Sequence, residues 1–531
     1  MKKKHRHVFF NLIFPAVVLG SITGALTALI VVLYKFLAKY VIGISENGYH
    51  YLLDDPIWIP LVIAGLFGLS FLYAYFYRMH ANLRGGGIPT SIGILRGFIS
   101  IHWLYNLVGV FLLSLTTFLT GVPLGTEGPS VQMGTAMGYA SVSLTPKHKA
   151  WGRYAMTGGA CAGFSVATGA PISGIMFAIE EAHQRIAPMI LIVSATSVSV
   201  SYMIAEMLSS ILGVETALFP SMKLLTLTAK DCWVPLLVGV VIGLFAVLFL
   251  QFYRVVNSFY NKTLKQIPHV YRIFLILTLT LSLGLVSYSF VSTGHHLIEV
   301  LFEGRVAIYM LILILLVRSI LTLSANTLSL TGGIFLPILA LGATLASILG
   351  KTLQVFLGLG EEYYTVILVL GIVACISGMM KTPLTAIVFA VEALSCYENI
   401  LFVIIAAIVA YIIPEVLSVE SINDRVLEHR IEHMIEGKHI KVIDLFVVVQ
   451  EKSFAVGKQV RDIFWPANLF VLSVKRGDAP QAEVDEHGGK VIYEGDVLHI
   501  RYSTIDEKRT KEELFAIVGE QNCEEQEISD V

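Results

Sequence analysis

Charged residues are scarce in this chain. Only 14% of its 531 residues are charged and 55% are hydrophobic, whereas about a quarter of the residues in a typical soluble domain are charged. This scarcity excludes an ordinary soluble protein over most of the chain. The formal net charge of −2 is close to neutral and indicates no partner of either charge. We expect no nucleic-acid partner.

Cysteines are few and scattered. Four of the five lie in or beside apolar segments, where a thiol usually behaves as a small hydrophobe, and none forms a CxxC pair: Cys161, Cys232, Cys375, Cys396 and Cys523. The spacing indicates neither a disulfide framework nor a metal knuckle. We expect no metal and no other cofactor.

Apolar stretches of about 20 residues, enough to cross a bilayer, are abundant. The clearest are 8–34, 57–78, 104–124, 188–213, 233–253, 271–293 and 399–418. They predict an all-α polytopic membrane protein. The basic sequence MKKKHRH precedes the first stretch and favours a cytoplasmic N-terminus by the positive-inside rule.

Spanning stretches are absent after about Ser421, where charge returns. There FVVVQ, NLFVLSVKR and GDVLHIRYS are short β-branched and aromatic runs separated by turn residues, which predict a small sheet domain. We therefore predict three parts: a transmembrane domain over 1–424 with repeats at about 8–213 and 230–418, a linker helix over 425–440, and a small α+β domain over 441–531.

An internal repeat is visible in the membrane part. APISGIMFAIEEA (170–182) resembles TPLTAIVFAVEAL (382–394), and at nearly the same spacing GTEGPSVQMG (125–134) aligns with GGIFLPILALG (332–342). The matched pairs are Pro171 with Pro383, Phe177 with Phe389, Glu180 with Glu392, and Pro129 with Pro337. Duplicated halves are typical of transporter folds, in which broken helices point at a site near the bilayer midplane.

The segment 154–182 is too short for two full crossings. It is interrupted by TGAP and flanked by Lys147, Lys149 and Arg153 on one side and by Arg185 on the other. Both basic flanks are expected in the cytoplasm, and each crossing needs about 20 residues. We therefore predict two half-depth helices that enter and leave on the same side.

Three glycine–proline clusters are interpreted as helix starts: RGGGIPTSIG (84–93), GTEGPSVQMG (125–134) and GGIFLPILALG (332–342). Proline suits the first turn of a helix, and the preceding glycines leave the backbone amides open to a ligand. Unpaired N–H groups and the helix dipole favour an anion. Three converging starts would bind an anion without a full positive charge, so that the ion is able to leave. The alternative is that the glycines only allow close helix packing.

Glu127 lies in the second cluster. A carboxylate at an anion-binding helix start competes with the anion for the site, and protonation removes its charge. Such a group couples anion movement to proton movement. Carboxylates within a membrane are usually functional, and the alternative is that Glu127 only caps its helix.

Glu180 and Glu181 end an apolar half-helix, and a place at the water interface without further function is the alternative for both. The match of Glu180 with Glu392 suggests a shared structural role. Ala393 stands opposite Glu181 in the repeat, so Glu181 is the better candidate for a site used in one half only.

At these residues the sequence resembles the CLC family of chloride channels and proton-coupled anion exchangers. GGGIP resembles the family's GSGIP motif, GTEGP its GREGP motif and GGIFLP its GxFxP motif, in the same order, over roughly residues 8–430. The resemblance implies two inverted-topology repeats with broken and re-entrant helices, and a homodimer with one anion pathway per subunit.

The resemblance also implies which residues carry transport. Glu127 matches the external gate and proton carrier, and Glu181 matches the internal proton-transfer glutamate. Gly86 stands in place of the usual serine and Asn423 in place of a tyrosine that contacts the ion, so we expect fewer side-chain ligands and weak preference among chloride, bromide and nitrate. The implied anion-binding residues are Gly85, Gly86, Thr126, Gly128, Ile334, Phe335 and Asn423.

The tail resembles the TrkA-C or RCK-C lobe of potassium-transport regulators through VVVQEKSFAVGKQVRDI and EGDVLHI. It is not the paired CBS arrangement of many eukaryotic relatives, which favours a prokaryotic plasma-membrane protein with a cytoplasmic tail. We expect a small-molecule or nucleotide ligand on this lobe to bias transport.

The function expected is H+/Cl− antiport across the lipid bilayer, with a passive voltage- or pH-gated chloride channel as the alternative. An enzyme within the membrane would need paired acids, a nucleophile or a metal constellation, and none is evident. A membrane sensor would leave the three anion-site motifs unexplained.

Overall fold

The computed structural model describes residues 13–143, 150–213, 215–219, 224–435, 440–476, 483–484, 488–504, 506–520 and 524–530. The basic sequence MKKKHRH, Lys147, Lys149 and Cys523 lie outside the described residues. Expectations that rest on them remain predictions.

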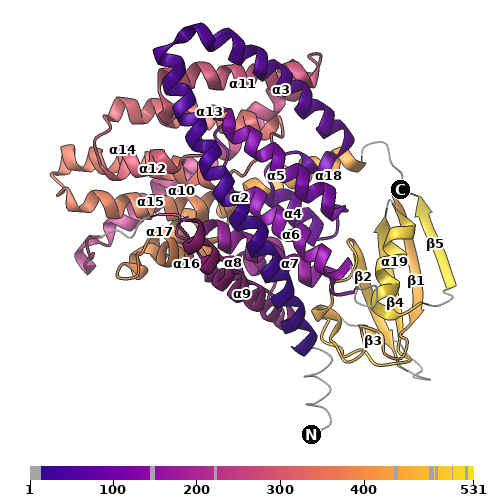
Figure 1. Cartoon of the computed structure of the whole chain (residues 1–531). Coiled ribbons are helices and arrows are strands. Elements are labelled where there is room, and N and C mark those ends of the chain that lie inside the picture. Colours follow the sequence, from indigo (N-terminus) through magenta and orange to yellow (C-terminus); the bar gives the residue numbers. More distant parts are fainter. Residues whose placement is uncertain are drawn as a thin grey trace.

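Helices form the whole membrane part (Figure 1). They are α2 (Phe14–Asp54), α3 (Ile59–Met79), α4 (Ile88–Leu95), α5 (Trp103–Leu119), α6 (Glu127–Ser143), α7 (Gly152–Thr168), α8 (Pro171–Phe177), α9 (Pro188–Leu212), α10 (Trp233–Ser258), α11 (His269–Val286), α12 (His295–Phe302), α13 (Ile308–Thr327), α14 (Phe335–Leu357), α15 (Glu362–Met380), α16 (Pro383–Ala393), α17 (Ile400–Val416) and α18 (Ile422–Ile435).

Eight helical segments among the described residues are long and apolar enough to cross a membrane, so the chain is a multi-pass membrane protein. Three of them, α13, α14 and α15, are not among the clearest apolar stretches of the sequence. The stretch 104–124 is shorter as a helix than predicted, because α5 ends at Leu119 and the loop of the second glycine cluster follows.

The packing of the helices repeats along the chain. α2 packs on α9 as α10 packs on α17, and α6 packs on α7 as α14 packs on α15. α4 and α12 also correspond, since each follows a glycine with a positive φ, 72° at Gly87 and 109° at Gly294. Glycine adopts this conformation without steric cost. The repeat predicted from two segments therefore extends through the membrane domain.

The re-entrant pair predicted for residues 154–182 is present. α7 ends at Gly169 in the left-handed conformation, and α8 begins at Pro171, whose missing N–H suits a first turn. A π-helical turn, Ala178–Ala182, follows α8. Arg153 and Arg185, on the two flanks, both contact the C-terminal domain, so the segment begins and ends on one face of the molecule.

The C-terminal domain is an antiparallel sheet with one helix, α19 (Glu507–Val518). The strands β1 (Lys441–Val448), β2 (Leu469–Lys475), β3 (Glu483–Val484), β4 (Val497–Thr504) and β5 (Glu524–Asp530) lie in the order β3-β2-β4-β1-β5. The three runs predicted as strands are β1, β2 and β4. Leu445 lies opposite Ile500 in the register of β1 and β4, and both are fully buried in a core separate from that of the helices.

The expected linker helix corresponds to α18, which begins at Ile422. Its first turns are not solvated, because Val426 and Leu427 are buried and the helix packs against α4. α18 therefore contributes side chains to the membrane domain before the chain enters β1.

Candidate anion and proton site

The three predicted helix starts meet in the structure. Gly125 and Gly333 exchange two backbone hydrogen bonds of 2.6 and 2.7 Å, which join the starts of α6 and α14. A side chain at Gly87 would collide with the backbone of Gly128, and a side chain at Gly128 would collide with the backbones of Gly86 and Gly333, so the starts of α4, α6 and α14 lie in contact. Close backbone approach of this kind requires glycine. The prediction of three converging helix starts is confirmed.

Several N–H groups at these starts lack a protein partner. Among the described residues, no hydrogen bond joins the backbone N–H of Gly86, Thr126, Gly128, Ile334 or Phe335 to an acceptor. Free donors at the positive end of a helix dipole form a site for an anion. The N–H of Gly85 instead donates to the Ser329 carbonyl at 2.7 Å, so this N–H group is not among the free donors.

Glu127 is fully buried where these helices meet. One carboxylate oxygen, Oε1, lies 3.4 Å from the Thr126 hydroxyl, which donates to it. The other, Oε2, has no hydrogen-bond partner among the described residues. Both the carboxylate and the Leu336 side chain of α14 lie against Gly125. A buried carboxylate with an unpaired oxygen is costly, so its position beside open N–H groups points to exchange with an anion.

Glu181 lies in the π-helical turn and is 7% exposed. The amide nitrogen of Asn423, at the start of α18, donates to its carboxylate. Arg96 donates to the backbone carbonyls of Glu181 and Ala182, both at 3.0 Å, and pairs with Asp424 at 2.9 Å. The end of α4 and the start of α18 together hold this glutamate in place.

Asn423 therefore has a different partner from the expected one. Its amide nitrogen serves Glu181, and only its oxygen is unpartnered among the described residues. An oxygen acceptor does not favour an anion. The sequence indicates Glu181 and Asn423 as separate candidates, and the structure places their side chains in direct contact.

Glu180 and Glu392 each cap the start of a helix in the opposite repeat. The Glu180 carboxylate accepts from the N–H groups of Leu384 and Thr385 at 2.9 and 2.8 Å, at the start of α16. The Glu392 carboxylate accepts from Ile172 and Ser173 at 2.7 and 2.9 Å, at the start of α8. The shared structural role suggested by the repeat is confirmed.

Two charged residues of this region were not predicted from the sequence. The guanidinium of Arg430 in α18 lies against Gly85 and hydrogen-bonds the Thr90 hydroxyl. This guanidinium adds a full positive charge to the site, which the sequence predicted to consist of backbone N–H groups. Its surroundings in the sequence, a polar helix, carry no signal for this position. Lys35 in α2 donates to the Thr216 carbonyl at 2.9 Å, and a lysine within a long apolar helix indicates a functional position.

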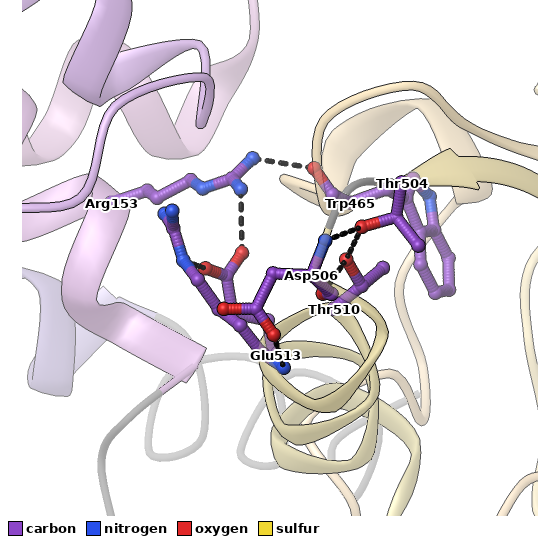
Figure 2. Close-up of polar contacts among 7 residues, drawn as sticks. Arg153, Trp465, Thr504, Asp506, Thr510 and Glu513 are labelled. Atoms are coloured by element: carbon purple, nitrogen blue, oxygen red, sulfur yellow. Dashed lines mark hydrogen bonds and ion pairs between the residues drawn. The ribbon is translucent and has the colours of Figure 1, made fainter. Parts of the chain in front are cut away.

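The C-terminal domain docks beside Glu181. Figure 2 shows Arg153 donating to the Trp465 carbonyl at 2.5 Å and pairing with Glu513 of α19 at 2.8 Å. The Phe464 ring lies 4.5 Å from the ring of His183, two residues after Glu181. The docked domain therefore contacts the chain directly after the turn that carries Glu181.

No group of three histidine, cysteine, aspartate or glutamate side chains within the described ranges is placed to hold a metal ion.

Known proteins share this sequence and fold. The "H(+)/Cl(-) exchange transporter ClcA" of Vibrio parahaemolyticus is 25% identical over 438 residues, covering 79% of this chain and 91% of the relative. That of Salmonella paratyphi A is 26% identical over 416 residues, covering 77% and 87%.

Two solved structures have the same fold. A slow cyanobacterial Cl−/H+ antiporter matches with a TM-score of 0.70 at 22% identity, over 78% of this chain and 98% of that chain. A CLC-type fluoride/proton antiporter matches with a TM-score of 0.63 at 19% identity, over 75% and 95%. The model of the family described as "Voltage gated chloride channel" matches residues 65–415. The chain is therefore a member of the voltage-gated chloride channel, or CLC, family of membrane transport proteins.

Proposed function

We propose that this protein exchanges chloride for protons across the membrane in opposite directions. The observation that carries the proposal is the Glu127 carboxylate, buried with one oxygen unpaired among free helix-start N–H groups. The printed names of the curated relatives, H(+)/Cl(−) exchange transporters, agree with it.

In the proposed cycle, ionised Glu127 occupies the positive helix starts and blocks the anion path. Protonation removes its charge, the side chain moves away, and chloride takes its place. Chloride then receives hydrogen bonds from backbone donors that have no partner in the described structure: the N–H groups of Gly86, Thr126, Gly128, Ile334 and Phe335. Arg430 beside Gly85 adds attraction for the anion as it approaches.

Glu181 is proposed to receive protons on the face where the C-terminal domain docks and to pass them toward Glu127. Asn423 and Arg96 act as positioning residues, because one holds the Glu181 carboxylate and the other its backbone. Glu180, although adjacent, takes no part in proton transfer, since its carboxylate is used by the N–H groups of α16.

Purified protein in liposomes tests this function. An outward chloride gradient should drive protons uphill into the vesicles, and protein-free vesicles should show only leak. Chloride flux without proton movement would instead identify a passive channel. Absence of any anion flux would contradict a transport role and favour a sensor.

We propose that residues 441–531 form a cytoplasmic regulatory domain of the TrkA-C or RCK-C type, and that the membrane domain extends through α18. A cavity of about 450 Å³ lies between the two domains, lined by Ile99, Met156, Arg153, Phe464, Arg509 and Glu513 among others. Its lining is largely apolar and also carries Arg153 and Arg509 with Glu512 and Glu513, so it offers apolar contact and both donors and acceptors to the proposed small-molecule or nucleotide ligand. A ligand there would press on the docking contacts next to Glu181.

Two variants separate docking from general damage to this domain. Phe464→Ala should change the rate of exchange, because its ring contacts His183. Phe470→Ala is the matched control, since that ring is 65% exposed on β2. Truncation after residue 437 should remove any response to added metabolites; an identical response with and without the tail would contradict regulation by it.

The protein is proposed to be a homodimer in a prokaryotic plasma membrane, with its N-terminus and tail in the cytoplasm. The start of α2 and the C-terminal domain lie on the same side of the molecule (Figure 1). Ile172 and Leu384, at the repeat-related starts of α8 and α16, are 51% and 55% exposed and provide an apolar face for a second copy. Single-molecule subunit counting tests the dimer, and protease access in sealed vesicles tests the orientation of the tail.

A further inference from the structure

Asn326 is a buried amide without a partner. It lies in the last turn of α13 and is 5% exposed. Neither its Nδ2 nor its Oδ1 has a hydrogen-bond partner among the residues that the structure describes. A buried amide without hydrogen-bond partners is energetically unfavourable. The unpaired Asn326 amide therefore indicates a ligand that supplies the missing hydrogen bond.

The amide points at the position of the missing serine. A Cβ atom placed on Gly86 would lie 3.6 Å from Asn326 Nδ2, 3.6 Å from the Gly332 carbonyl oxygen and 3.6 Å from the Pro89 ring. This space lies between the start of α4 and the loop before α14. A Cβ atom there would be in ordinary van der Waals contact with all three groups, and the N–H of Gly86 has no acceptor among the described residues.

We propose that Asn326 donates a hydrogen bond from Nδ2 to the anion bound beside Gly86. The proposal deepens the transport function proposed above and rests on it. In this chain a side chain from the second repeat supplies the donor that the first repeat lacks. A neutral amide attracts a halide without adding another full charge, so the ion is still able to leave.

The amide bears on affinity rather than on selectivity. Its NH2 group carries two hydrogens in one plane, and such a pair can donate to a spherical halide or to a planar oxyanion. We therefore expect Asn326 to strengthen the binding of both chloride and nitrate, which agrees with the weak discrimination expected from Gly86.

Isothermal titration calorimetry of the full-length protein with chloride and nitrate provides the test. Asn326→Leu should weaken chloride binding about tenfold, the effect of one hydrogen bond to a charged group. It should weaken nitrate binding by a similar factor. Asn326→Asp, which has nearly the same shape, should bind neither anion at neutral pH. Adding Gly86→Ser to Asn326→Leu should restore chloride affinity, because the serine hydroxyl replaces the lost donor and a Cβ atom at Gly86 meets its neighbours only at ordinary contact distance.

Asn399 provides the matched control. It is 1% exposed, but its amide is satisfied by the Leu225 carbonyl and the Leu227 N–H, each at 2.8 Å. Asn399→Leu should lower thermal stability and leave chloride affinity unchanged. Equal chloride affinity in the wild type and Asn326→Leu would overturn the inference and leave the transport function standing. Absence of chloride binding to the wild type would instead count against the anion site itself.

Discussion

Two kinds of helix start exist in this membrane domain, and they differ in how they are closed. At α8 and α16 a glutamate from the opposite repeat accepts two backbone N–H groups and remains fixed. At α6 and α14 the N–H groups of Gly128 and Phe335 have no acceptor among the described residues, and Glu127 lies beside them with one oxygen unpaired within the same part of the chain. The same attraction between a carboxylate and a helix start thus serves stability in one pair and exchange in the other.

The repeat makes this difference visible along the sequence. Residues present in both halves hold the fold. Glu180 and Glu392 cap helices, and the ring centroid of Phe389 lies 5.6 Å from that of Phe335. Residues present in one half carry the proposed chemistry. Phe335 occupies the repeat position of Glu127, and Ala393 that of Glu181.

The largest effect is expected at the open helix starts. Glu127→Gln should abolish proton transport, because the amide cannot ionise. Glu127→Ala should also abolish it while chloride flux continues, because no side chain is left to block the path. Parallel chloride-electrode and pH recordings on liposomes check both. Proton exchange that persists in Glu127→Ala would contradict the claim that the carboxylate at the uncapped start of α6 carries the proton.

A smaller effect is expected at the partner of Glu181. Asn423→Leu removes the amide that holds the carboxylate, so proton flux should fall several-fold while the protein still exchanges. Chloride flux in the absence of a proton gradient should stay within about twofold of the wild-type flux. The substitution misplaces the Glu181 carboxylate but leaves the anion site intact. Equal losses in both fluxes would indicate a structural role for Asn423 instead.

The smallest effect on transport is expected at a capped start. Glu392→Ala removes a carboxylate that accepts two N–H groups of α8, which should cost about 1–2 kcal/mol of stability. The ratio of protons to chloride ions should not change. Thermal unfolding in detergent measures the loss of stability, and flux recordings on liposomes measure the number of protons moved per chloride ion. A changed proton-to-chloride ratio would contradict the claim that residues shared by both repeats hold the fold and take no part in transport.

The sequence predicted the parts of the fold that depend on local pattern. Apolar length, glycine before proline, and the two matched segments indicated membrane helices, helix starts and a repeat, and they singled out Glu127 and Glu181. It did not predict Arg430, Asn326 or the use of the Gly85 N–H by Ser329. These contacts join segments far apart in the chain, and neither periodicity nor a short motif reports which distant side chain fills a given space.

The most direct test compares two adjacent glutamates by the same substitution. Glu180→Gln and Glu181→Gln differ by one position, but one carboxylate caps α16 and the other contacts Asn423. The measurement is the number of protons moved per chloride ion in liposomes. We predict that Glu181→Gln loses proton transport and keeps chloride flux, whereas Glu180→Gln keeps the wild-type ratio with lower thermal stability. Unchanged coupling in Glu181→Gln, or coupling lost only in Glu180→Gln, would contradict the account.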